Sequence, residues 1–460
     1  MHYVSLPTLQ TNPLLSSKGD LAFKKTYPAL FGLFRNNFLP RNIQIVGYAR
    51  SALDLNEFKR RVSSRIKFHS EKEKDLLPAF LEKCTYVSGK YDESDSYEKL
   101  RAFVENVEGV VHGDRHRIFY MALPPSVFGV AAKGLKEHLY TTKGTNRLIV
   151  EKPFGKDTQS SNDLSVFGKI LEGRRNLSFA NVFFESVWDR SHINNVQITF
   201  KEPIGTEGRG GYFDEFGIIR DWLWRSLHLS AEDVRDEKVK VLRAIQPLTV
   251  DDMILGQYTK SADGREPGYL DDPTVPQGSV TPTFAAGAFY IKNERWEGVP
   301  FILKCGKALD EQKTEIRIQF KDVANNLYSD IARNELVIRV QPREAVYMKF
   351  MNKQPGLGNA ATVSELDMTY NKRYSEIKIP DAYESLILDA LKGDKSNFVR
   401  DDELDAAWKI FTPVLHAIEE GKMKSEPYTF GTRGPVHLSR FVETHGYTRS
   451  LGYSWGSSKM

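Results

Sequence analysis

Short apolar runs and helical patterns alternate through the first 150 residues of the chain. Residues 42–48 and 117–123 are predicted to be buried strands, because apolar and β-branched side chains dominate them. Residues 126–138 carry apolar side chains at helical spacing, and a further strand over 147–150 runs into Glu151-Lys152-Pro153-Phe154-Gly155. Strands that alternate with helices predict a parallel sheet with helices on its faces.

After about residue 190 the predicted strands follow one another directly. Residues 314–323 alternate between apolar and polar positions, which predicts a strand with one buried face, and residues 335–350 form a hairpin that turns near Pro342. Further strands are expected over 195–200, 238–245, 289–291 and 301–304. Consecutive strands with a period of two predict a largely antiparallel sheet.

Two helices are predicted near the C-terminus, over 382–392 and 401–420. The second places five apolar side chains on one stripe, which we expect to be core: Leu404, Trp408, Phe411, Leu415 and Ile418. The pattern as a whole predicts an α/β nucleotide-binding domain followed by a larger α+β domain.

Composition narrows the class of protein. A length of 460 residues with 40% hydrophobic and 27% charged residues is typical of a globular protein of two or three domains, and it excludes a disordered or collagen-like chain. A net charge of +4 is too small to indicate a nucleic-acid or membrane partner. Two cysteines cannot form a disulfide framework, and neither a membrane-spanning run nor a signal peptide is present, so we expect a cytoplasmic protein.

Two features of the N-terminal region could bind a dinucleotide. Residues 16–22 (Ser-Ser-Lys-Gly-Asp-Leu-Ala) are a turn of small residues opening a helix, where free N–H groups bind pyrophosphate, although locally a loop that caps a surface helix is favoured. Arg50 follows the 42–48 strand, where arginine suits the 2′-phosphate of NADP and an acidic residue would suit NAD. The alternative for Arg50 is a solvated side chain at a strand end.

Three further features could bind a sugar or a phosphate. Lys152 ends a strand at the edge where open α/β sheets bind ligands, or it is simply an exposed lysine. The stretch 201–214 has four glycines in seven residues, which indicates a bent backbone or a close ligand rather than a surface loop, and Asp221 follows it. A basic cluster that could bind phosphates, with the solvated face of a sheet as the alternative, comprises Lys304, Lys307, Lys313, Arg317, Arg333, Arg339 and Lys349.

Metal and nucleophile motifs are not found in the sequence. The ten histidines never pair at ligand spacing with cysteine or a carboxylate. His112 and His116 are four residues apart, but the residues between them are typical of a loop. We therefore expect no metal site and no Ser- or Cys-based nucleophile.

Taken together, these motifs resemble the glucose-6-phosphate dehydrogenase family in its eukaryotic, fungal-like form, from about Gly19 to Trp455. The matching motifs include Gly19-Asp20-Leu21-Ala22, Glu151-Lys152-Pro153-Phe154-Gly155 and Phe430-Gly431-Thr432-Arg433-Gly434-Pro435. The resemblance implies a Rossmann-like NADP-binding domain over 1–173, with a degenerate first strand. It also implies a C-terminal substrate-binding and dimerisation domain over 174–460, with a mainly antiparallel sheet.

The resemblance implies NADP⁺-dependent oxidation of glucose 6-phosphate to 6-phosphogluconolactone, in the oxidative pentose phosphate pathway, by a homodimer or tetramer. Coenzyme-site residues would be Gly19, Asp20, Leu21, Arg50, Tyr120 and Lys152. Sugar-site residues would be Lys152, Glu202, Asp221, Lys307 and Gln312, the last standing where relatives often have arginine. A second, structural NADP⁺ would be bound by Lys304, Lys313, Arg317, Arg339, Tyr347, Asp367 and Trp455.

Three departures from the family pattern accompany these matches. Ser16 replaces the first glycine of the family's Gly-x-x-Gly-Asp loop. The segment with the family's phosphate-binding histidine, tyrosine and lysine, expected just before Leu177, is missing. Ser226 stands where the family has its general-base histidine, so no catalytic base is identifiable. His228 is the one candidate substitute for this base, but it is disfavoured because it is two residues out of register, which on a helix rotates a side chain by about 200°.

These departures leave three interpretations open. The chain is a glucose-6-phosphate dehydrogenase that has lost segments, as skipped or mispredicted exons would produce. Alternatively, it is a non-catalytic paralogue that binds NADP⁺ or dimerises with an active chain. The third interpretation is a different sugar oxidoreductase that shares only the Glu-Lys-Pro turn with the family.

Overall fold

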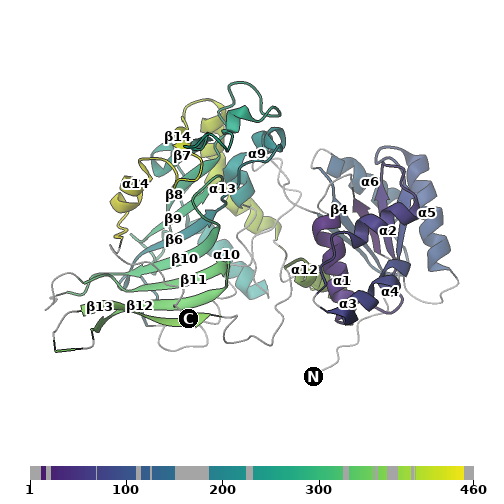
Figure 1. The fold of residues 1–460 in the computed structure, drawn as a ribbon, viewed down its shortest axis with the longest axis horizontal. Coiled ribbons are helices and arrows are strands. Elements are labelled where there is room, and N and C mark those ends of the chain that lie inside the picture. Colours follow the sequence, from purple (N-terminus) through teal and green to yellow (C-terminus); the bar gives the residue numbers. More distant parts are fainter. Residues whose placement is uncertain are drawn as a thin grey trace. The chain divides into compact units, whose positions relative to one another are not determined.

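The chain forms two compact units in a computed structural model (Figure 1). One comprises Met1–Phe154 with Lys378–Asn397, and the other Gly155–Ile377 with Phe398–Met460. The described residues are 22–68, 70–109, 115–124, 127–150, 186–220, 236–324, 331–354, 356–357, 361–369, 382–394, 398 and 400–449, together with the backbone of 12–16, 221–223 and 232–235.

The first unit contains a parallel sheet in the order β3-β2-β1-β4-β5. Its strands are β1 (Asn12–Ser16), β2 (Ile45–Ala49), β3 (Cys84–Ser88), β4 (Arg117–Ala122) and β5 (Asn146–Val150). Every residue of β2 and β4 is buried, as expected for parallel strands covered on both faces. The predicted parallel sheet is confirmed.

The central strand β1 differs from the sequence-based expectation. The pattern at residues 10–15 is that of a poor strand, yet Leu14 pairs with Gly47 of β2 and with Tyr120 of β4. Backbone hydrogen bonding from both neighbours therefore makes this segment a strand, although its side-chain pattern does not indicate one.

Helices surround this sheet, and one of them comes from far along the chain. They are α1 (Tyr27–Arg35), preceded by a π-helical turn (Ala22–Thr26), α2 (Leu55–Ser63), α3 (Glu71–Asp75), α4 (Leu77–Glu82), α5 (Ser94–Glu108), α6 (Phe128–His138) and α12 (Ala382–Lys392). In α12, Ile387 and Leu391 join the core that α1 lines. Arg147 donates hydrogen bonds of 2.9 and 2.7 Å to the last carbonyls of α12, at Ala390 and Leu391. The expected domains 1–173 and 174–460 stay a prediction; the two compact units divide at Phe154 and Gly155 instead, and they place α12 with the N-terminal unit.

The second unit contains a mixed sheet in the order β13-β12-β11-β10-β6-β9-β8-β7-β14. Its strands are β6 (Ile193–Lys201), β7 (Met253–Thr259), β8 (Phe284–Tyr290), β9 (Pro300–Gly306), β10 (Lys313–Phe320), β11 (Glu335–Gln341), β12 (Ala345–Lys353), β13 (Ala361–Thr369) and β14 (Glu426–Thr429). Only β6–β9 and β7–β14 are parallel among these neighbours. The predicted, mainly antiparallel sheet is confirmed.

One helix of the second unit covers a segment that the sequence pattern predicts to be a strand. The helices of this unit comprise α9 (Gly210–Leu223), α10 (Glu232–Ala244), α13 (Asp401–Glu419) and α14 (Leu438–Thr444). The strand predicted over 238–245 is wrong, because most of that segment is α10. Lys238 and Val239 are both buried, whereas a strand with one solvated face would bury only one of two neighbours. The Lys238 ammonium lies 3.6 Å from the Glu403 carboxylate of α13, whose predicted apolar stripe is confirmed as core.

Candidate functional site

Glu202 and Lys307 lie side by side where two parallel strands end. Glu202 follows β6 and Lys307 follows β9, and the last residues of these strands, Lys201 and Gly306, are paired in register. The Glu202 N–H donates to the Gly306 carbonyl at 3.0 Å. The Lys307 ammonium lies 2.6 Å from the Glu202 carboxylate, and both side chains are partly exposed. The pair can therefore donate to and accept from the hydroxyls of a polar ligand.

The glycine-rich stretch leads from Glu202 into helix α9. The Gly210 N–H donates to Asp272 at 3.0 Å, and a Cβ at Gly210 would overlap the Val275 side chain. Gly208 has a φ of 76°, so the backbone bends within this stretch, and the packing at Gly210 is too close for a side chain; both favour the bent-backbone interpretation over a plain surface loop. At Gly217 the helix is kinked, with φ of 68°, and the second half of α9 carries the backbone of Asp221.

Most of the other residues predicted for the sugar site and its base fall outside the part of the chain that the structure describes. Gln312 is exposed. The Asp221 side chain, Lys152, Ser226 and His228 lie outside the described residues.

On the nucleotide side, Arg50 follows β2 at the carboxyl end of the parallel sheet. Its side chain is exposed, and its guanidinium carbon lies 5.8 Å from the centre of the Tyr91 ring. No carboxylate in the described ranges forms an ion pair with it. An available guanidinium at this edge fits a ribose 2′-phosphate. Tyr120 is buried in β4, and Gly19, Asp20 and Leu21 lie outside the described residues.

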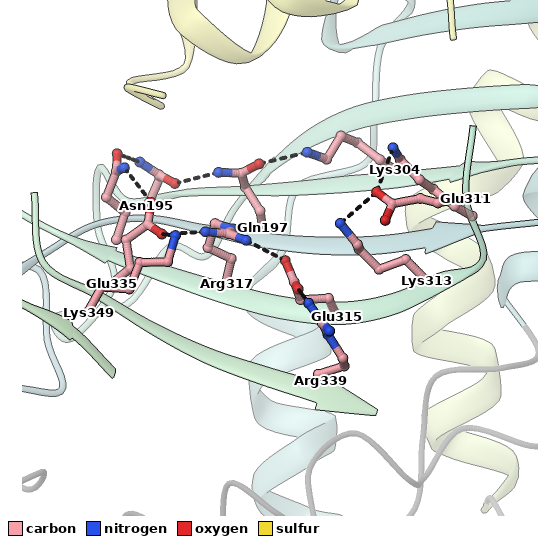
Figure 2. Close-up of polar contacts among 12 residues, drawn as sticks. Asn195, Gln197, Lys304, Glu311, Lys313, Glu315, Arg317, Glu335, Arg339 and Lys349 are labelled. Carbon is pink, nitrogen blue, oxygen red and sulfur yellow. Dashed lines mark hydrogen bonds and ion pairs between the residues drawn. The ribbon is translucent and has the colours of Figure 1, made fainter. Parts of the chain in front are cut away.

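A charged ladder crosses β10, β11 and β12 in the second unit (Figure 2). We use this name for Glu315, Arg317, Glu335, Arg339 and Lys349. Arg317 contacts both carboxylates, at 2.7 Å for Glu315. Lys349 lies 3.0 Å from Glu335, and Arg339 lies 3.6 Å from Glu315. Lys349 is 5% exposed over the whole residue, so the solvated-face interpretation of the basic cluster is wrong for Lys349, and the carboxylates of Glu315 and Glu335 beside it are buried too.

Burial and charge shift several pKa values around this ladder. Burial, with Arg317 and Lys201 nearby, lowers the pKa of Lys304 to about 7. Burial, followed by Arg317, also lowers the pKa of Lys349. Burial tends to raise the pKa of Glu315, but Arg317 and Lys313 outweigh it and hold that pKa below the usual value. The ladder is therefore held together by internal ion pairs.

The remaining residues predicted to bind a second nucleotide surround the ladder. Lys304 donates to Gln197 at 2.7 Å, and Lys313 lies 2.6 Å from Glu311. Tyr347 is only 1% exposed, and Asp367 accepts a 2.8 Å hydrogen bond from Thr369. Trp455 lies outside the described residues. A polyphosphate here would have to share the cations with the carboxylates that already contact them.

The described ranges offer neither a metal site nor a membrane span. Within them, no group of three His, Cys, Asp or Glu side chains could hold a metal ion. No helix described there is long and apolar enough to cross a bilayer.

Sequence reasoning missed the residues around Lys307. The Lys307 ammonium lies over the ring of Phe213, and the Tyr428 hydroxyl donates to the Lys307 carbonyl at 2.7 Å. Phe213 falls inside the glycine-rich stretch and Tyr428 two residues before the Phe430 motif. The sequence therefore marked the segments that contain or adjoin Phe213 and Tyr428, but it did not reveal that these residues contact Lys307.

Comparison with known proteins gives matches along nearly the whole chain. A family model described as "Glucose-6-phosphate dehydrogenase, NAD binding domain" matches residues 14–169, and the corresponding C-terminal domain model matches 175–455. The glucose-6-phosphate 1-dehydrogenase of Emericella nidulans is 54% identical, covering 96% of this chain and 93% of the relative. That of Dictyostelium discoideum is 50% identical, covering 96% and 95%. A solved glucose-6-phosphate dehydrogenase in complex with glucose 6-phosphate aligns with a TM-score of 0.89 and 44% identity, covering 97% of this chain and all of that one.

The alignments with the two sequence relatives are longer than the chain itself. The Emericella nidulans alignment extends over 476 residues, whereas this chain has 460. The relative therefore has residues that this chain lacks, in agreement with segments missing from the family pattern.

Proposed function

The chain belongs to the glucose-6-phosphate dehydrogenase family, and from this premise we propose that it oxidises the C1 hydroxyl of glucose 6-phosphate to 6-phosphogluconolactone with NADP⁺. The observation that carries the proposal is the contact between Glu202 and Lys307 at the shared edge of β6 and β9. These are the positions that the family resemblance assigns to the sugar hydroxyls. Membership also implies a dinucleotide cofactor, because one family model is that of a nucleotide-binding domain.

In this proposal the chain's residues bind and orient the two ligands. Glu202 accepts and Lys307 donates hydrogen bonds to the sugar, together with Asp221, Lys152 and Gln312. Arg50 contacts the 2′-phosphate, and Gly19, Asp20, Leu21, Tyr120 and Lys152 complete the coenzyme site. NADP⁺ supplies the hydride acceptor. Since Ser226 stands at the family's base position, we expect turnover lower by a factor of about 10²–10⁴ than with a histidine there.

The test uses the full chain and follows the absorbance of the reduced coenzyme with glucose 6-phosphate. We expect slow turnover that Ser226→His raises and that Glu202→Gln and Lys307→Met each abolish. Lys409→Met is the matched control, because Lys409 is an exposed lysine of α13 that pairs with Asp405. Failure of the unmodified chain to bind either ligand, measured by calorimetry, would contradict the proposal.

A non-catalytic, NADP-binding or dimerising paralogue is the second candidate. The available guanidinium of Arg50 favours it, because a nucleotide-binding feature remains while Ser226 occupies the base position. This candidate predicts NADP⁺ binding without turnover, even at high enzyme concentration. Slow turnover that depends on Glu202 and Lys307 would exclude it.

We also propose a second, structural NADP⁺, bound by Lys304, Lys313, Arg317, Arg339, Tyr347, Asp367 and Trp455. The resemblance supports this site, whereas the internal pairing of the charged ladder opposes it. Equilibrium dialysis decides the matter, with two nucleotides per chain expected and one contradicting the site. We further propose a cytoplasmic homodimer or tetramer, for which sedimentation gives the mass of the assembly.

A further inference from the structure

Aromatic side chains contact Lys307 both at its ammonium group and at its backbone carbonyl. Its ammonium lies 2.6 Å from the Glu202 carboxylate and over the ring of Phe213, whose centre is 5.4 Å away. Its backbone N–H donates to the Thr283 carbonyl at 3.0 Å, and its carbonyl accepts from Tyr428 at 2.7 Å. The strand end and the amine are therefore held by separate contacts.

The ring of Phe213 is itself fixed in place. Phe213 lies on α9, is 8% exposed, and contacts the Tyr269 ring edge-on at 6.0 Å between centres. The Tyr269 hydroxyl donates to Asp214, the residue after Phe213, at 2.7 Å. Tyr258 continues the aromatic cluster, with its ring 5.8 Å from that of Tyr269 and 6.4 Å from that of Tyr428. Both aromatic contacts to Lys307 thus belong to one cluster.

A cation over an aromatic face is attracted by the ring quadrupole, and the attraction grows as the cation loses water. The Lys307 side chain is 13% exposed, so most of its water is already displaced. Glu202 must share its carboxylate with a sugar hydroxyl when substrate binds, whereas the Phe213 ring has no N–H, O–H or carbonyl group with which a sugar hydroxyl would form a hydrogen bond. The ring therefore holds the ammonium when Glu202 turns to the substrate.

We propose that Phe213 is a positioning residue for the sugar site, whose ring holds the Lys307 ammonium in place to donate to a substrate hydroxyl. This inference rests on the proposed function, because it concerns the same site. It assigns to α9 a role separate from that of Asp221, namely to orient the lysine that directly follows β9.

The test compares Phe213→Leu with the rescue variant Phe213→Tyr, which keeps the ring. Phe216→Leu is the matched control, because Phe216 lies one turn away on α9 and is equally buried, at 6% exposure against 8%. Calorimetry measures glucose 6-phosphate binding by the full chain. We expect Phe213→Leu to weaken binding about 5- to 30-fold, and the other two variants to retain it.

A second measurement is independent of substrate. Lysines are reductively methylated with ¹³C, and the Lys307 signal is assigned by its loss in Lys307→Arg. The ring above the amine shifts this signal, so Phe213→Leu should move it and Phe216→Leu should not. An unmoved signal, or unchanged sugar affinity in folded Phe213→Leu, overturns the inference. If the unmodified chain binds no sugar, the proposed function fails, and the lysine signal alone decides the role of Phe213.

Discussion

Lys349 lies directly opposite Glu335 in the register of β11 and β12, and its ammonium is 3.0 Å from the Glu335 carboxylate. The two side chains are 7% and 1% exposed. Arg317 and Gln319 also donate to Glu335, the latter at 3.1 Å. Cross-strand pairing thus places a lysine within a buried network in which a single carboxylate serves three donors.

The first prediction concerns the stability of this pair. Glu335→Met removes an acceptor from the buried Lys349 and the partly buried Arg317, so we expect a loss of about 3–5 kcal/mol in the free energy of unfolding. Lys349→Met should cost less, because Arg317 and Gln319 still donate to Glu335. The double variant should lose less than the sum of the two, as urea unfolding can measure. Additive losses would show that the pair does not interact energetically. Asp405→Ala, in the exposed Lys409 pair, is the control and should change stability by less than about 1 kcal/mol.

The second prediction concerns the pH dependence that Lys304 causes. Its pKa falls from 10.5 to about 7 in the folded chain, so between these values the unfolded chain binds more protons. The free energy of unfolding contributed by Lys304 therefore rises with pH across about 7 to 10.5. Lys304→Met should be more stable than the unmodified chain at pH 6, and this advantage should vanish near pH 10. Urea unfolding at several pH values measures the difference in unfolding free energy between Lys304→Met and the unmodified chain. A difference that does not change with pH would contradict the lowered pKa of Lys304.

The sequence predicted the sheets well where side-chain pattern and environment agree. The apolar runs of β2 and β4 and the hairpin of β11 and β12 were visible because burial of those strands follows their composition. It failed for β1, whose backbone is paired by β2 and β4. The prediction for 238–245 also failed, because most of that segment belongs to α10, whose Glu, Lys, Arg, Leu and Ala residues favour a helix. For β1 the deciding contacts are tertiary, and the local pattern does not contain them.

The sequence also predicted the candidate site only in part. Glu202 and Lys307 were identified from family motifs, but their contact depends on β6 and β9 being parallel neighbours, although about a hundred residues separate them. The alternation along β10 predicted a solvated face, whereas β11 and the charges beside it bury Glu315. Spacing reveals which residues share a face of one strand, but it does not reveal which other elements cover that face.

The third prediction concerns the choice of coenzyme. Arg50→Ala removes an exposed guanidinium that no described carboxylate engages, so the fold should be little affected. A charge-assisted hydrogen bond contributes about 1.5–3 kcal/mol, so NADP⁺ affinity should fall roughly 10- to 100-fold. NAD⁺ affinity should stay the same, because NAD⁺ has no 2′-phosphate. Fluorescence titration measures both, with Arg60→Ala on α2 as control. Equal losses for the two coenzymes would contradict the assignment of Arg50.

The last prediction concerns the kink in α9. Gly217 has φ of 68° and ψ of 171°, a conformation that is essentially restricted to glycine, and the next N–H leaves the helix to bond Pro282 at 3.2 Å. Gly217→Ala should cost about 1–3 kcal/mol of unfolding free energy. It should also weaken glucose 6-phosphate binding, because the kink sets the direction of the half of α9 that carries Asp221.

Gly298→Ala is the control that separates the loss of stability from the loss of sugar binding. Gly298 has φ of 80° and open space around it, so alanine there meets a backbone penalty without a clash. It precedes the start of β9, whereas Lys307 follows the end of that strand, so the sugar site should not be disturbed. Sugar binding measured by calorimetry should therefore fall in Gly217→Ala and persist in Gly298→Ala. Equal sugar affinities in the two variants would mean that the kink serves packing alone and does not orient Asp221.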